Sequence, residues 1–129
     1  MTIKKVIKNF GLPWEKHYSQ SVKVGDTIYL SGQVSHDDKG NLVGPGDMEA
    51  QLKQVYLNIQ KILAQHEATM QNIVDEILFV TDMNTAYAAA IKCRKEFFGE
   101  TPAVASTIVQ IQRLAFPEYL IEIKCVAKL

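Results

Sequence analysis

The chain has 129 residues, of which 47% are hydrophobic and 22% charged, as in an ordinary soluble globular protein. This length predicts one domain over 1–129. Fourteen basic residues balance fourteen acidic ones, which argues against nucleic-acid binding because phosphate affinity needs clustered positive charge. Only Arg94 and Arg113 could clamp a carboxylate in bidentate fashion.

No apolar run approaches the ~20 residues of a membrane span. The first eight residues carry positive charge without an apolar core, so we expect a cytoplasmic protein without a signal peptide. Cys93 and Cys125 lack a CxxC context and are predicted to be reduced, buried thiols. The three histidines lack metal-ligand spacing to one another or to either cysteine, and no dinucleotide or P-loop motif is present, so the sequence signals neither a metal site nor such a phosphate site.

The first part of the chain predicts β structure. Residues 2–7 could form a short strand, and 21–24 and 27–31 form a hairpin around Gly25-Asp26. Residues 36–47 are rich in Gly, Asp, Asn and Pro, which indicates a surface excursion.

A long amphipathic helix should follow. Asp47 is its predicted N-cap. Apolar residues at helical spacing define its buried face: Leu52, Val55, Tyr56, Ile59, Ile62 and Leu63. His66 completes this stripe and is interpreted as partly buried packing rather than as a ligand.

The second half of the chain predicts a strand, a helix and two further strands. Residues 74–80 form an apolar run of strand length, typical of a strand covered on both sides. A second helix follows and ends before Gly99. Its buried face is predicted to hold Tyr87, Ala90, Ile91, Arg94, Phe97 and Phe98. Two strands, 106–114 and 119–127, close the chain on either side of Pro117.

This order predicts an α+β sandwich with two helices packed on one face of a mixed β-sheet. The other sheet face would remain open. If that face is apolar, it should pack against another subunit.

Two features could carry chemistry. Gly32, within Ser31-Gly32-Gln33, would let a ligand approach the backbone, where neighbouring N–H groups can hold a carboxylate oxygen. The alternative is a strand that simply ends in a turn. Glu122 lies inside the last strand and could be a general base with a raised pKa in a closed cleft. It could equally be a surface residue on the face of Lys124.

Several motifs in order resemble the Rid family, also called YjgF or L-PSP. They are His17-Tyr18-Ser19-Gln20-Ser21-Val22, Tyr29-Leu30-Ser31-Gly32-Gln33, Phe79-Val80-Thr81-Asp82-Met83, Val109-Gln110-Ile111-Gln112-Arg113-Leu114 and Ile121-Glu122-Ile123. The resemblance covers nearly the whole chain. It implies a chorismate-mutase-like fold, a homotrimer, and small-molecule ligands bound in clefts between subunits.

The resemblance also implies a chemistry. Many members hydrolyse reactive enamines or imines, such as 2-aminoacrylate, to a 2-oxo acid and ammonia without a metal or organic cofactor. By position, Tyr18, Ser31 and Gly32 match ligand-binding residues of the family. Glu122 matches the glutamate that positions or activates water.

The family arginine that clamps the substrate carboxylate is missing. Aligning the chain with the family motif at Pro102 places Val104 at the position of this arginine. Aligning it at the longer downstream motif places Ser106 there, and we prefer this second alignment. Ser106 can donate only one neutral hydrogen bond. Arg113 is seven residues further along, about 23 Å away if the strand continues at ~3.3 Å per residue, so we do not expect it to substitute within one subunit. Ile91 is the preferred counterpart of a pocket asparagine that some deaminases carry.

Three functions follow from this resemblance. The first is a small-metabolite-binding trimer with an inter-subunit cleft, weak or inactive on 2-aminoacrylate. The second is an enamine or imine deaminase with an altered substrate, in which Glu122 still handles water. The third is a regulatory or interaction trimer that uses its surface. A ribonuclease activity is disfavoured, because neutral charge makes a poor RNA surface.

Overall fold

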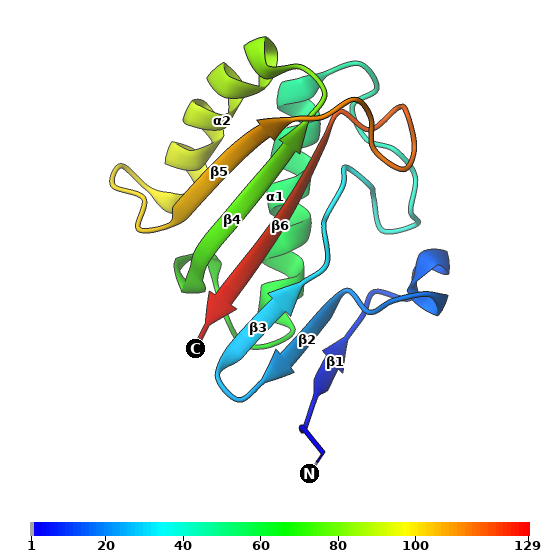
Figure 1. Ribbon diagram of the computed structural model, residues 1–129, viewed down its shortest axis with the longest axis vertical. Coiled ribbons are helices and arrows are strands. Elements are labelled where there is room, and N and C mark those ends of the chain that lie inside the picture. Colours follow the sequence, from blue (N-terminus) through cyan, green and yellow to red (C-terminus); the bar gives the residue numbers. More distant parts are fainter. Residues whose placement is uncertain (1) are drawn as a thin grey trace.

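The computed structural model describes residues 2–129 and consists of one twisted sheet with two helices on one side (Figure 1). The strands are β1 (Val6–Lys8), β2 (Ser21–Val24), β3 (Thr27–Leu30), β4 (Ile73–Val80), β5 (Ala105–Gln110) and β6 (Ile121–Lys128). The α-helices are α1 (Met48–Ala64) and α2 (Met83–Phe98). Short 3₁₀ turns occupy η1 (Pro13–Lys16) and η2 (Met70–Asn72).

The sheet order is β1-β2-β3-β6-β4-β5, with β4 and β5 parallel and all other neighbours antiparallel. The predicted α+β class, the mixed sheet and the helices on a single face are therefore confirmed. Within residues 2–129, the helices are too short or too polar to cross a membrane.

The first helix forms where its sequence predicts it. The carboxylate of Asp47 accepts a hydrogen bond from the N–H of Ala50 at 3.0 Å, which satisfies one orphan donor of the first turn. The apolar stripe of α1 is fully buried against the sheet. From the sheet side, β6 contributes every second residue to the same core: Ile121, Ile123, Cys125 and Ala127.

The predicted buried face of α2 is partly wrong. Tyr87 and Ile91 are 55% and 45% exposed, whereas Ala86, Ala90 and Cys93 are buried. These buried residues are small, so α2 can approach α1 closely, and the bulkier side chains are left on the outside. Ile91 is therefore a surface residue of the protomer.

Some strand boundaries also differ from the predictions. β1 begins only at Val6, and β5 ends at Gln110 rather than at residue 114. β5 is an edge strand that pairs only with β4, and β4 ends at Val80, opposite Gln110. Beyond that point the chain has no strand to pair with, so residues 111–120 turn away and form a loop.

The sheet face opposite the helices is apolar over much of its area. One row crosses four strands through Ile7, Val22, Tyr29 and Val126. A second row joins Glu122, Phe79 and Val109. Tyr29 is 49% exposed and Val109 is 38% exposed in the protomer. β4 is therefore covered by helices on one face only, and the other face carries the exposed apolar surface that the sequence suggested for subunit packing.

Two smaller expectations are confirmed. Both cysteines are free and buried. His66 is buried just beyond α1, where its Nε2 lies 2.8 Å from the Oγ of Ser21. This contact ties the end of the helix to β2.

Candidate active site

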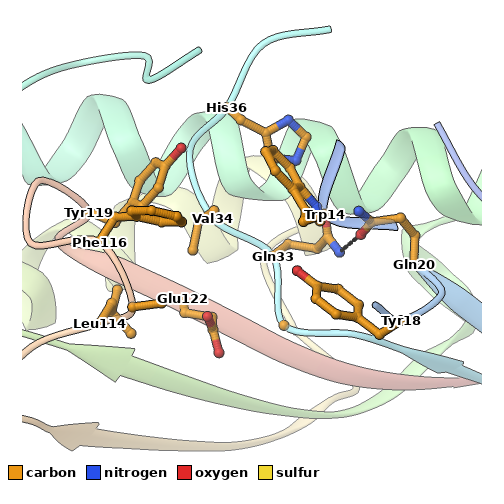
Figure 2. A pocket seen from close by; sticks show the side chains of 12 residues that line it. Trp14, Tyr18, Gln20, Gln33, Val34, His36, Leu114, Phe116, Tyr119 and Glu122 are labelled. Atoms are coloured by element: carbon orange, nitrogen blue, oxygen red, sulfur yellow. Dashed lines mark hydrogen bonds between the residues drawn. The ribbon is translucent and has the colours of Figure 1, made fainter. Parts of the chain in front are cut away.

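A cavity of about 90 Å³ opens where β3 ends and β6 begins, and it is large enough for several water molecules. Figure 2 shows its walls, which come from three separate segments and from β6. The lining side chains are Trp14, Tyr18, Gln20, Gln33, Val34, His36, Leu114, Ala115, Phe116, Tyr119 and Glu122, together with Gly32. The structure thus brings together Tyr18, Gly32 and Glu122, three of the five residues singled out from the sequence.

Glu122 packs directly on Gly32. A methyl group built on Gly32 would lie 2.6 Å from Cδ and 2.9 Å from Cγ of Glu122, closer than real contacts allow. The other six glycines of the chain have positive φ, but Gly32 does not. Gly32 is therefore needed for space rather than for backbone conformation, and the space is taken by the Glu122 carboxylate.

The carboxylate of Glu122 is partly withdrawn from water. Burial raises its pKa, and the nearby Lys124 lowers it in part. The ammonium of Lys124 donates to the carbonyl of Leu30 at 3.0 Å and does not line the cavity. Within residues 2–129 no hydrogen bond to the Glu122 carboxylate is formed, so its oxygens are available to a ligand or a water molecule. Of the two interpretations of this residue, the structure favours the half-buried cleft carboxylate.

Glu15 places Trp14 in the wall. Its carboxylate accepts hydrogen bonds from the N–H groups of Phe10 at 2.9 Å, Gly11 at 2.6 Å and Leu12 at 2.8 Å. Burial alone would raise the pKa of Glu15, but these backbone hydrogen bonds outweigh it and lower the pKa. The 3₁₀ turn η1 is thereby fixed, and its indole is presented to the cavity (Figure 2).

Tyr18 stands at the mouth of the cavity, where it is 48% exposed. Burial and the negative charges of Glu122 and Glu15 raise the pKa of its phenol. At neutral pH the hydroxyl therefore keeps its proton and can donate a hydrogen bond to a ligand.

Two buried amides form the floor. Gln33 Nε2 donates to Gln20 Oε1 at 2.7 Å and to the carbonyl of Ser31 at 3.0 Å. Because the Ser31 carbonyl needs a donor, this orientation is fixed, and Gln33 Oε1 is left without a partner although the side chain is 1% exposed. Gln20 Nε2 also lacks a partner of good geometry, but the Gln20 side chain interacts with the Glu15 carboxylate.

Helix α1 holds two walls of the cavity through buried amides two turns apart. Asn58 Nδ2 donates to the carbonyls of Val34 and His36, both at 3.0 Å. Gln51 Nε2 donates to the carbonyl of Glu118 at 3.1 Å, and its Oε1 accepts from the N–H of Leu120 at 2.8 Å. The irregular segments that line the cavity are thus anchored to a rigid element.

The remaining predicted residues lie elsewhere. Ser31 donates its hydroxyl proton to the carbonyl of Ser19 at 2.6 Å, so it supports the wall without lining it. Ser106 is on the opposite side of the sheet from Glu122. Its Oγ donates to Oε2 of the buried Glu76 at 2.6 Å and accepts from Arg94. The structure therefore does not place Ser106 in the protomer cavity, because its hydroxyl completes a buried ion pair instead.

Arg113 lies closer to the cavity than an extended strand would allow. Because β5 ends at Gln110, the chain bends, and Arg113 donates to the carbonyls of Leu114 at 3.0 Å and Ala115 at 2.9 Å. Both of these residues line the cavity. Arg113 thus shapes the wall with its guanidinium, although it is not itself a lining residue.

Sequence reasoning missed most of the wall. Trp14, His36, Phe116 and Tyr119 lie in turn segments without periodicity, and only their aromatic character in such segments could have singled them out. In the part of the chain that the structure describes, no group of three His, Cys, Asp or Glu side chains could hold a metal ion.

Comparison with known proteins gives a consistent result. The family model described as Endoribonuclease L-PSP matches residues 11–129. A RutC family protein of Pyrococcus abyssi is 33% identical over 110 residues, covering 85% of this chain and 84% of that protein. The 2-iminobutanoate/2-iminopropanoate deaminase of Mus musculus is 34% identical over 90 residues, covering 69% and 66%.

Solved structures agree over almost the full length. A protein of unknown function of the Rid family from Yersinia pestis superimposes with a TM-score of 0.86 at 29% identity, covering 98% of this chain and 100% of that one. RidA from an Antarctic Psychrobacter superimposes with a TM-score of 0.85 at 27% identity, with the same coverage.

Proposed function

Because the chain belongs to the Rid (YjgF, L-PSP) family, we propose that it is a homotrimeric protein that binds a small metabolite in an inter-subunit cleft. In this proposal the protein is weak or inactive on 2-aminoacrylate. Tyr18, Gly32 and Glu122 form the binding surface, and Ser31 supports it. The supporting observation is a half-buried carboxylate in a cavity that no arginine or lysine of residues 2–129 lines.

The lack of a cation at the cavity has an energetic consequence. A hydrogen bond between charged groups contributes about 1.5–3 kcal/mol, so its loss weakens binding of a small carboxylate by roughly tenfold to more than a hundredfold. Glu122 would in addition repel such a substrate.

The test is direct. A dehydratase generates 2-aminoacrylate from serine, and formation of the 2-oxo acid is followed with and without this protein. The mouse deaminase, measured in parallel, serves as the positive control. We expect little or no acceleration by this protein, and a rate close to that of the mouse enzyme would overturn the proposal.

A second function, hydrolysis of a different imine or enamine, is supported by Glu122 itself. A carboxylate whose pKa is raised by burial is a suitable general base. It would take a proton from water as the oxygen attacks the imine carbon, and then return a proton to the nitrogen as the C–N bond breaks. The products are a carbonyl compound and ammonia.

For any imine that the protein turns over, Glu122→Gln should reduce kcat sharply, because an amide cannot accept the proton. Glu100→Gln is the matched control, since Glu100 is an exposed carboxylate outside the cavity. Equal rates for Glu122→Gln and the native protein would remove Glu122 from the mechanism.

The trimer is supported by the apolar open face of the sheet. Light scattering at micromolar concentration should give three times the chain mass, and a mass near one chain would refute the trimer. Tyr29→Lys, in the centre of this face, should weaken assembly because it would bury a charge. Leu57→Lys, on the exposed side of α1, should leave the mass unchanged.

A further inference from the structure

The charge of the cavity indicates what kind of ligand it takes. Among its lining residues the ionisable side chains are Glu122, His36 and two tyrosines. Lys124, the cation closest to Glu122 along the strand, donates to the Leu30 carbonyl and lies outside the lining. The acidic group that faces a ligand therefore has no lysine or arginine beside it among the lining residues of the part of the chain that the structure describes.

Two unpaired polar groups of the lining residues are acceptors, whereas the unpaired donor Gln20 Nε2 is directed to the Glu15 carboxylate. The Glu122 carboxylate and Gln33 Oε1 are both hydrogen-bond acceptors without a protein donor. An acceptor withdrawn from water is costly unless a donor reaches it. A ligand bearing N–H groups would satisfy the Glu122 carboxylate, whereas a ligand carboxylate would not.

The His36 ring is held in place by two contacts. Its Nδ1 lies 2.9 Å from the carbonyl of Asp37, a contact that orients the ring. The ring also packs edge-on against Trp14, with 5.2 Å between centroids.

Aromatic rings complete the environment. Figure 2 shows Tyr119 and Phe116 on one side of the space and Trp14 and Tyr18 on the other. The faces of such rings attract cations, and their bodies accept apolar groups. Aromatic rings around a single carboxylate therefore favour the binding of an organic cation.

We infer that the cavity selects a small nitrogen cation that carries no carboxylate, an iminium or alkylammonium ion with a short apolar substituent. The inference rests on the proposed function and narrows its substrate class to protonated aldimines and ketimines. In turnover, the water oxygen bonds to the iminium carbon and Glu122 accepts one water proton. Glu122 returns this proton to the nitrogen as the C–N bond breaks, and the second water proton passes from the new carbonyl oxygen to the departing ammonia. The iminium ion and water thus give an aldehyde or ketone and an ammonium ion, with charge conserved.

Binding can be measured without turnover, because Trp14 is the single tryptophan of the chain and lines the cavity. Its fluorescence is titrated with propylammonium, 1-propanol and butanoate, which share a three-carbon tail and differ in the head group. We expect propylammonium to bind about tenfold more tightly than butanoate, the effect of one charged hydrogen bond. Glu122→Gln should abolish this preference, and Glu100→Gln should retain it.

A second measurement compares two imines that differ only in the carboxylate. An amine oxidase produces propan-1-imine from propylamine, and a dehydratase produces 2-iminobutanoate from threonine. Release of ammonium and of propanal or 2-oxobutanoate is followed with the full-length protein, with catalase present in the oxidase reaction. We expect faster hydrolysis of propan-1-imine.

The two measurements separate the possible failures. Preferential binding of propylammonium without hydrolysis of either imine supports the ligand class and refutes hydrolysis. Equal or tighter binding of butanoate, or faster hydrolysis of 2-iminobutanoate, overturns the ligand class and leaves a Rid-family deaminase. Trp14 fluorescence that responds to none of the three probes also overturns it, since the cavity would then bind no such cation.

Discussion

Substitution of Gly32 by alanine tests whether the Glu122 carboxylate is held where the structure places it. The added methyl group would come within 2.6 Å of Glu122 Cδ and 2.9 Å of Cγ. Since Gly32 has no positive φ, the backbone itself tolerates alanine. The strain must therefore be relieved by rotation of the Glu122 side chain, which no hydrogen bond within residues 2–129 holds back.

The expected cost in stability is small. A side chain forced about 30° from its rotamer loses roughly 0.5–1.5 kcal/mol, so the free energy of unfolding of Gly32→Ala should fall by about 1 kcal/mol. The functional cost should be larger, because the displaced carboxylate no longer faces the cavity. We expect the propylammonium preference to fall about tenfold, as in Glu122→Gln.

A double-mutant cycle makes this argument specific. In the Glu122→Ala background the methyl group added at position 32 meets no carboxylate, so Gly32→Ala should there cost almost nothing. Urea denaturation followed by circular dichroism gives the four stabilities, and Trp14 fluorescence gives the four affinities. Gly32→Ala with native stability and native cation preference would show that Glu122 does not pack on Gly32.

Three further predictions concern the framework of the site. Burial, aided by nearby lysines, lowers the pKa of His66, so the unfolded chain takes up a proton below pH 6.5 that the folded chain does not bind. The stability contributed by His66 should be complete above pH 6.5 and decline on acidification. The urea midpoints of the native protein and of His66→Gln should therefore converge as the pH is lowered from 8 to 5. Arg94→Met leaves Glu76, which is 1% exposed, without its cation, so the free energy of unfolding should fall by about 3 kcal/mol. The control Lys92→Met removes an exposed ion pair and should lower it by less than about 1 kcal/mol. A loss for Arg94→Met as small as that for Lys92→Met would contradict a buried ion pair between Arg94 and Glu76. Asn58→Ala leaves two main-chain carbonyls of the cavity wall unpaired, so the free energy of unfolding should fall by about 1–3 kcal/mol. Asn58→Asp should be less stable still, because its carboxylate would face both carbonyl oxygens. An Asn58→Asp variant more stable than Asn58→Ala would contradict this geometry.

Local patterns predicted the elements well where one periodicity dominates. The stripe of α1, its Asp47 cap and the alternation of β6 each follow from the chain alone. The prediction of the buried face of α2 was partly wrong because large apolar residues were favoured, whereas the packed face consists mainly of alanines and Cys93. Periodicity alone does not indicate how closely two helices approach.

The site was predictable only in part, and the reason is physical. Tyr18, Gly32 and Glu122 were found through ordered family motifs, and the structure brings them together. Ser106 was chosen by counting back from a strand motif. Its orientation depends on the buried carboxylate of Glu76, thirty residues earlier in the chain, which no local pattern indicates.

By itself the sequence determined the α+β class, the order of the elements and the scarcity of arginine. Each of these depends on composition or on neighbours within a few residues. Only the tertiary structure decided that Gly32 makes room for Glu122, and that Trp14 and Phe116, about a hundred residues apart, form walls of one cavity. It also decided that the two arginines serve Glu76 and a loop backbone. These relations follow from contacts between distant segments, and they leave Glu122 in a cavity that no lysine or arginine of residues 2–129 lines.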